Sequence, residues 1–124
     1  MKKIISTDKA PGAIGPYSQA VLVGNMVYTS GQIPVNPETG TFPEDIQEQA
    51  KQALENVKAV LAEAGTTLDK VFKTTVFIAD MEQFGLINEI YAQYFTSDFP
   101  ARSCVQVAKL PLGVGLEVEA IAYL

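Results

Sequence analysis

Apolar residues recur with a helical period in one long segment of the chain, residues 45–64. The positions that share this period are Ile46, Ala50, Ala53, Leu54, Val57, Val60, Leu61 and Ala64. Their spacing predicts an amphipathic helix whose single apolar stripe faces a core. Asp45 followed by Glu48 resembles a capping box at the start of this helix, and Gly65 is the expected left-handed stop.

Short runs rich in β-branched and aromatic residues predict strands on both sides of this helix. The predicted strands are residues 3–6, Tyr17 to Val23, Met26 to Ser30, Val71 to Ala79, Ala101 to Ala108 and Leu116 to Tyr123. Asp80 and Gln83 indicate the start of a second helix. Its predicted inward residues are Phe84, Ile87, Tyr91 and Tyr94 or Phe95. The order βββαβαββ predicts one α/β domain over residues 1–124, a mixed sheet of about six strands with both helices on one face.

The predicted strand over residues 71–79 is apolar on both of its faces. Val76 and Ile78 point to one side, and Phe77 and Ala79 point to the other. Because two helices cover only one face of such a sheet, the other face is a surface for self-association. We therefore expect a closed homo-oligomer in which sites can form between protomers. The alternative is a monomer whose loops cover that face, which the short loops disfavour.

The composition removes several classes of function. The net charge is −5 and the chain has no histidine, which argues against nucleic acid as a partner, Ser-His-Asp catalysis and common zinc sites. A single cysteine forms no internal disulfide, and no phosphate-binding glycine motif occurs, so no cofactor is expected. The apolar run at the N-terminus is too short for a signal peptide, and none reaches the roughly 18 residues of a membrane span. We expect a cytoplasmic protein without a membrane partner.

Arg102 is the only arginine in the chain, and it lies in an otherwise apolar predicted strand. Cys104 follows two positions later and shares its face of that strand. A planar guanidinium binds a carboxylate or phosphate with two hydrogen bonds, which a lysine cannot do. The segment therefore indicates a small anionic ligand held against the strand. An ion pair with a structural carboxylate is the alternative, and on general grounds it is the more common arrangement.

Glu117 and Glu119 project from one face of the last predicted strand. If this strand pairs with the strand of Arg102, a glutamate stands across from Arg102 or Cys104. Two solvated residues on an edge strand are the alternative. Cys104 has no histidine to activate it, so a structural cysteine that offers its backbone amide is favoured over a nucleophile.

Three further polar positions are weaker candidates for a binding site. Tyr17 and Ser30 lie in Gly- and Pro-containing stretches where backbone can approach a ligand, and their hydroxyls can bind a ligand or cap local turns. Asn88 interrupts the apolar face of the second helix, where an amide is often satisfied at a packing boundary.

The chain as a whole resembles the Rid family of reactive intermediate (imine) deaminases, also called the YjgF family. The matching segments run in order through the chain and are Ala10–Gln19, Thr29–Pro34, Asn56–Val60, Thr74–Ile78, Asn88–Tyr91, Pro100–Val105 and Glu117–Ile121. The resemblance implies a chorismate-mutase-like fold assembled as a trimeric barrel. It also implies hydrolysis of 2-iminobutanoate, 2-iminopropanoate or their enamine tautomers to 2-oxo acids and ammonia. Pyridoxal-phosphate dehydratases, including those of isoleucine biosynthesis, release such intermediates.

The resemblance also implies roles for individual residues. Arg102 is expected to hold the substrate carboxylate, and Glu117 the attacking water. The remaining substrate-binding positions, in a cleft between protomers, are Tyr17, Ser30, Gly31, Asn88 and Cys104. A carboxylate-binding regulatory module without catalysis is the alternative function, and ribonuclease activity is the least favoured. The chain departs from the family at Leu112-Gly113-Val114-Gly115, where charged residues are typical, so its substrate preference stays open.

Overall fold

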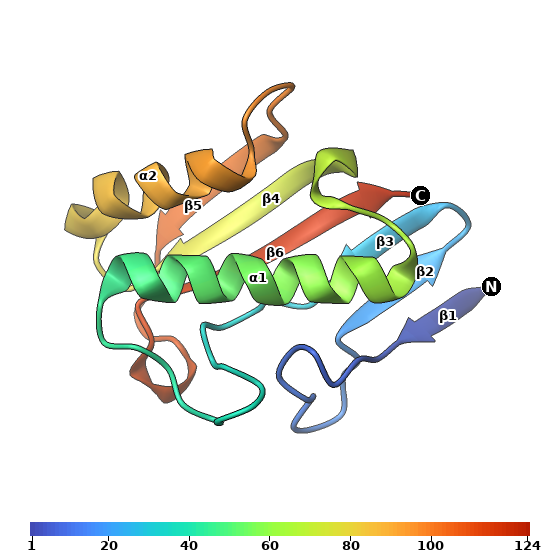
Figure 1. Ribbon diagram of the computed structural model, residues 1–124, viewed down its shortest axis with the longest axis horizontal. Coiled ribbons are helices and arrows are strands. Elements are labelled where there is room, and N and C mark those ends of the chain that lie inside the picture. Colours follow the sequence, from blue (N-terminus) through green and yellow to red (C-terminus); the bar gives the residue numbers. More distant parts are fainter.

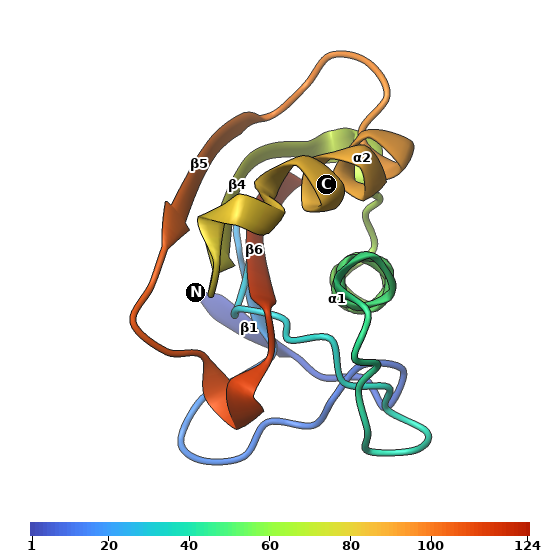
Figure 2. The ribbon, with the colours of Figure 1, turned by 90° about the vertical axis from the view of Figure 1, so that its left-hand side faces the viewer.

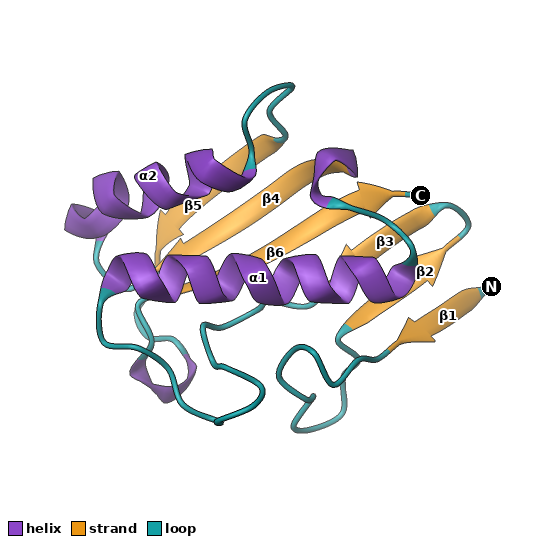
Figure 3. Ribbon diagram, in the orientation of Figure 1, coloured by secondary structure: helices purple, strands orange, loops and turns teal.

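The protein folds into a six-stranded sheet with two helices packed on one face (Figures 1 and 3). The structure is a computed structural model that describes all residues, 1–124. The strands are β1 (Lys2–Ile5), β2 (Ala20–Val23), β3 (Met26–Thr29), β4 (Val71–Ile78), β5 (Ala101–Gln106) and β6 (Leu116–Tyr123). The helices are α1 (Ile46–Ala64) and α2 (Phe84–Tyr94), with short 3₁₀ turns η1 (Leu68–Lys70), η2 (Met81–Gln83) and η3 (Pro111–Gly113). The predicted α/β class and the order βββαβαββ are confirmed. No helix combines the length and apolar character that crossing a membrane requires.

The apolar stripe of the first predicted helix forms the inner face of α1. At its start the Asp45 carboxylate accepts a hydrogen bond from the Glu48 backbone N–H at 2.9 Å, as the predicted cap requires. At its end Gly65 adopts a φ of 94°, a left-handed conformation that favours glycine. Both predicted boundaries of this helix are confirmed.

The strands lie in the order β1-β2-β3-β6-β4-β5, and only β4 and β5 are parallel. Parallel neighbours need a crossover, and here α2 supplies it. The last strand of the chain therefore lies inside the sheet, between β3 and β4, while β5 lies at an edge. Figure 2 shows both helices on the same side of the sheet, as predicted.

One predicted strand begins too early in the sequence. The second strand starts at Ala20, so Tyr17 and the buried Gln19 belong to the preceding loop. The Gln19 side chain accepts a hydrogen bond from the Thr7 backbone N–H and donates one to the Pro11 carbonyl, both at 2.7 Å. The Gln19 backbone carbonyl still accepts a hydrogen bond from the Ser30 N–H at 2.8 Å, and regular strand pairing begins one residue later, at Ala20. The fifth strand likewise ends at Gln106 instead of Ala108.

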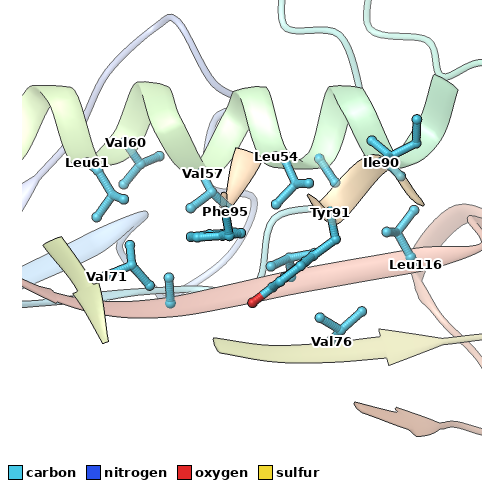
Figure 4. Packing of buried hydrophobic residues seen from close by; sticks show 14 of the residues in the cluster. Leu54, Val57, Val60, Leu61, Val71, Val76, Ile90, Tyr91, Phe95 and Leu116 are labelled. Carbon is cyan, nitrogen blue, oxygen red and sulfur yellow. The ribbon is translucent and has the colours of Figure 1, made fainter. Parts of the chain in front are cut away.

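The core fills the space between the helices and the sheet, as Figure 4 shows for Leu54, Val57, Tyr91 and Val76. The opposite face of the sheet carries no helix and exposes large apolar side chains. These are Tyr28, Phe72, Val105 and Tyr123. The predicted uncovered face is thus present in the protomer, and the homotrimer stays a prediction.

A buried amide fixes the loop that follows β3. The Asn56 Nδ2 donates to the carbonyls of Ile33 and Val35, each at 2.9 Å, and Asn56 is 1 % exposed. Gln52 donates to the Asn56 Oδ1 at 2.9 Å from a half-buried position. One side chain of α1 therefore satisfies two carbonyls of a segment without regular structure.

We expect Asn56→Ala to lower the free energy of unfolding by about 2–3 kcal/mol, because two carbonyls lose their donor. Urea denaturation at a fixed protein concentration measures this, and the m-value should not change. Gln52→Ala is the matched control, since it removes only the bond to Asn56, and it should cost less than about 1 kcal/mol. Equal losses in the two variants would contradict a special role for the bonds to Ile33 and Val35.

Candidate active site

Arg102 lies on β5 opposite Thr74 of β4, and its side chain faces α2. The Arg102 Nη1 donates to the Asn88 Oδ1 at 2.8 Å. The Arg102 Cζ lies 4.7 Å from the centroid of the Tyr91 ring and 5.4 Å from that of Phe84. Two aromatic rings and one amide therefore hold the guanidinium.

No carboxylate pairs with Arg102 in the protomer. The one ion pair of the chain joins Lys51 to Glu48, 3.7 Å apart on the surface of α1. The alternative of a structural ion pair for Arg102 is therefore not what the structure shows. The guanidinium keeps donors for an external anion, in a cleft of about 450 Å³ that Phe99 and Pro100 also line.

A buried hydrogen bond to Thr74 of β4 fixes the Tyr91 ring that supports Arg102. The hydroxyls of Tyr91 and Thr74 lie 2.8 Å apart, and Thr74 is fully buried. Burial raises the pKa of Tyr91, so its phenol stays neutral and the pair is a hydrogen bond between two hydroxyls. This buried bond sets the orientation of the ring under the guanidinium.

Cys104 shares the face of Arg102, as the strand periodicity predicts, and lies opposite Val76 of β4. Burial raises the pKa of its thiol, and the smaller effect of Arg102 in the other direction does not reverse this. A protonated thiol is a weak nucleophile. The geometry favours a structural role for the Cys104 side chain.

Glu117 lies on β6 opposite Phe77 of β4, on the sheet face without helices. The backbone of Gln32 pairs with that of Val118 in both directions, at 2.8 and 3.1 Å, and so brings Gly31 against the Glu117 carboxylate. A Cβ at Gly31 would clash with the Glu117 Oε2, which gives this glycine a steric reason. Burial raises the pKa of Glu117, and the nearby Glu119 raises it further.

A cleft of about 500 Å³ opens beside Glu117, and Tyr17, Ser30, Gly31 and Leu112 line it. The Ser30 hydroxyl donates to the Ser18 carbonyl at 2.6 Å, 12 residues earlier in the chain, so it ties two segments together and does not cap a local turn. The Tyr17 hydroxyl accepts a hydrogen bond from the Ile14 N–H at 3.4 Å and is exposed. The loops before β2, after β3 and before β6 gather at the same end of the molecule in Figures 1 and 2.

The expected position of Glu117 across from Arg102 is wrong within the protomer. Strand β6 pairs with β3 and β4, so β4 separates it from β5. Arg102 shares the helix-covered face with Thr74, whereas Glu117 shares the open face with Phe77. The alternation of residues along each strand predicts which side chains share a face of the sheet, but it does not predict the order of the strands.

The seven predicted site residues consequently form two half-sites. The first half-site contains Asn88, Arg102 and Cys104. The second half-site contains Tyr17, Ser30, Gly31 and Glu117. The first offers a free cation and the second a carboxylate of raised pKa, and neither offers both.

Two aromatic residues that the sequence pattern places in the core also belong to the Arg102 half-site. Phe84 and Tyr91 were predicted to point inward, and both also contact the guanidinium. The spacing could have indicated this role for Tyr91, because Tyr91 follows the candidate site residue Asn88 by three positions and so lies on the same helix face. The chain shows no group of three or more His, Cys, Asp or Glu side chains arranged to hold a metal ion.

The fold and the two half-sites define a small α/β protein with an unpaired arginine on one sheet face and a carboxyl group of raised pKa on the other. The family model described as endoribonuclease L-PSP matches residues 7–124. The chain is 54 % identical to an Escherichia coli protein named 2-iminobutanoate/2-iminopropanoate deaminase, over 98 % of each chain. It is 58 % identical to a RutC family protein of Haemophilus influenzae, over 98 % of this chain and 97 % of that one.

Solved structures agree over the same length. The crystal structure of E. coli TdcF with bound serine has a TM-score of 0.95 and 56 % identity, and 98 % of each chain is covered. The YjgF gene product of E. coli has a TM-score of 0.95 and 52 % identity, again over 98 % of each chain. The chain therefore belongs to the Rid/YjgF family, as the sequence motifs predicted. The predicted enzyme class, a hydrolase of the deaminase type, agrees with the names of these relatives.

The raised pKa of Glu117 predicts a gain of stability in Glu117→Gln at neutral pH. The folded protein binds a proton at Glu117 more tightly than the unfolded chain, so ionisation of this residue opposes folding as pH rises. The variant should unfold at a higher temperature than the wild type at pH 7, and the difference should vanish below the ordinary glutamate pKa.

Thermal unfolding across pH measures this difference, and Glu63→Gln on the exposed side of α1 is the control. The control should shift stability little and without this pH dependence. A wild type that is more stable than Glu117→Gln at pH 7 would show that the ionised carboxylate is favoured in the folded state.

Proposed function

We propose that this protein hydrolyses 2-imino acids of the 2-iminobutanoate and 2-iminopropanoate type to 2-oxo acids and ammonia, in clefts between protomers. Arg102 binds the substrate carboxylate, and Glu117 activates the water. Relatives named as deaminases, at 54 and 58 % identity over nearly the full length, support this reaction class.

The single observation that carries the proposal is the unpaired Arg102. The exposed guanidinium rests on two aromatic rings and one amide and has no acid partner, so its remaining N–H donors face solvent and can reach a ligand. A ligand carboxylate restores that counter-ion with charge-assisted hydrogen bonds. The adjoining cleft of about 450 Å³ has room for a small acid.

Glu117 suits the proton transfers that imine hydrolysis needs. Water adds to the carbon of the protonated imine as Glu117 takes one of its protons, which gives a neutral carbinolamine. Glu117 then returns that proton to the nitrogen, the C–N bond breaks to release ammonia, and the hydroxyl proton leaves to solvent as the C=O bond forms. A carboxyl whose pKa is raised toward neutrality can accept and return the proton.

The separation of the half-sites supports a shared cleft. Arg102 and Glu117 lie on opposite faces of one sheet, so a small substrate cannot reach both within a protomer. The uncovered sheet face beside Glu117 exposes apolar side chains that favour self-association. A closed ring of protomers can bring the Arg102 half-site of one to the Glu117 half-site of the next.

A carboxylate-binding module without turnover is the second candidate. The structure of the relative TdcF contains serine, which has a carboxylate but no imine carbon. The shared requirement is Arg102, and the distinguishing residue is Glu117. The description of the family as endoribonuclease concerns a third activity, against which the net charge of −5 and the absence of histidine argue in this chain.

We expect Arg102→Lys to lower kcat/KM for 2-iminopropanoate generated in situ by at least about 10-fold, because a lysine cannot make the bidentate contact. Glu117→Gln should abolish turnover while pyruvate, as a carboxylate ligand, still binds in calorimetry. Full turnover in Arg102→Lys would contradict the binding role of the guanidinium. Wild-type binding without any turnover would favour the regulatory module.

Mixed protomers test whether the two half-sites meet between copies. Arg102→Ala and Glu117→Ala should each be inactive alone. Refolding them together in equal amounts should restore about one quarter of the wild-type activity, because each mixed trimer regains one intact cleft. A mixture that stays inactive, although exchange of labelled protomers is complete, would refute the shared cleft.

A further inference from the structure

Two large apolar side chains stand exposed beside Glu117. Ile14 is 91 % exposed and Leu112 is 70 % exposed, although both line the cleft that contains the carboxylate. Neither belongs to the residues that the proposed reaction uses. Exposed apolar side chains that meet at the mouth of a polar site indicate contact with an apolar part of a ligand.

The cleft beside Glu117 is continuous with a second cavity. The two share Ile14, Tyr17, Gly31, Ile33 and Leu112, and the second adds about 300 Å³ along the loop that follows β3. The residues lining the two cavities include no lysine or arginine. The available space therefore extends from the carboxylate toward apolar side chains and not toward a cation.

The backbone at Leu112 strengthens this interpretation. Leu112 has a φ of 60°, in the left-handed region that favours glycine, and the following Gly113 has a φ of 74°. Turn hydrogen bonds from Gly113 to Leu110 and from Val114 to Pro111, both 3.2 Å, hold this conformation. A leucine is disfavoured there on backbone grounds, and backbone strain of this kind is concentrated at functional sites.

We propose that Leu112 and Ile14 bind the side chain of the substrate and make the enzyme selective for 2-imino acids with extended apolar side chains. This inference rests on the proposed function and names its substrate class. A longer alkyl chain gains contact with Leu112, Ile14 and Ile33. A side-chain carboxylate instead leaves water for a cavity whose own lining supplies Glu117 and no cation, while the Arg102 of the shared cleft is already occupied by the other carboxylate of the substrate.

The test compares kcat/KM for imines generated in situ by amino acid oxidases from alanine, norleucine and glutamate. The wild type should prefer the norleucine-derived imine over the glutamate-derived one by at least about 100-fold. Leu112→Lys should lower this ratio about 10-fold or more, because it removes the apolar contact and adds a cation. Leu112→Gly, which suits the backbone, should lower the preference for norleucine over alanine about 10-fold.

Leu86→Lys is the matched control, since it makes the same substitution at an exposed leucine of α2 that lines neither cavity. Its substrate ratios should equal those of the wild type. Calorimetry with 2-oxohexanoate and 2-oxoglutarate gives a readout that does not need turnover. A preference for 2-oxohexanoate that weakens in Leu112→Lys supports the inference even if no imine is hydrolysed, a result that would overturn the proposed function alone. Hydrolysis with equal ratios in the wild type and both Leu112 variants would overturn the inference alone.

Discussion

The parallel pairing of β5 with β4 determines where the chemistry of this chain lies. A parallel pair needs a crossover, and α2 crosses above the pair on the helix-covered face. That crossover brings Asn88 and Tyr91 onto the guanidinium of Arg102. The same pairing places β4 between β5 and β6, so it also separates Arg102 from Glu117. The parallel pairing of β4 with β5 therefore both supports the Arg102 guanidinium and separates it from the Glu117 carboxylate.

Two features that oppose folding lie at the Glu117 half-site. Glu117 has a raised pKa through burial, and Leu112 adopts a backbone conformation that suits glycine. Elsewhere the chain follows local rules, with a capped α1 and no buried side-chain polar atom left without a hydrogen bond. Departures of this kind are expected where function constrains a sequence that is otherwise consistent with its fold.

Periodicity predicted the parts of the fold that depend on local spacing. The long helix, the faces of each strand and the shared face of Arg102 and Cys104 follow from periods of 3.6 and 2. The order of the strands depends on pairing between distant segments, which alternation does not specify, and there the placement of Glu117 was wrong. Alternation also extended the second strand back to Tyr17, because the bonds of the Gln19 side chain to Thr7 and Pro11, 12 and 8 residues earlier, leave no signal in the local pattern. The family motifs, in contrast, selected residues of both half-sites and implied a cleft between protomers, without showing that Arg102 and Glu117 lie on opposite faces of the sheet.

The separation of Arg102 from Glu117 has a consequence for the proposed reaction. If the two had faced each other on adjacent strands, they would have formed an ion pair. The guanidinium would then have lost its free donors, and the positive charge would have lowered the pKa of Glu117. Placement on opposite faces keeps the cation unpaired and the carboxyl easily protonated in each protomer. In the shared cleft that we propose, the substrate carboxylate would neutralise Arg102 first, so Glu117 would keep its raised pKa for proton transfer. The absence of a direct pair within the protomer therefore supports the proposal of a divided site.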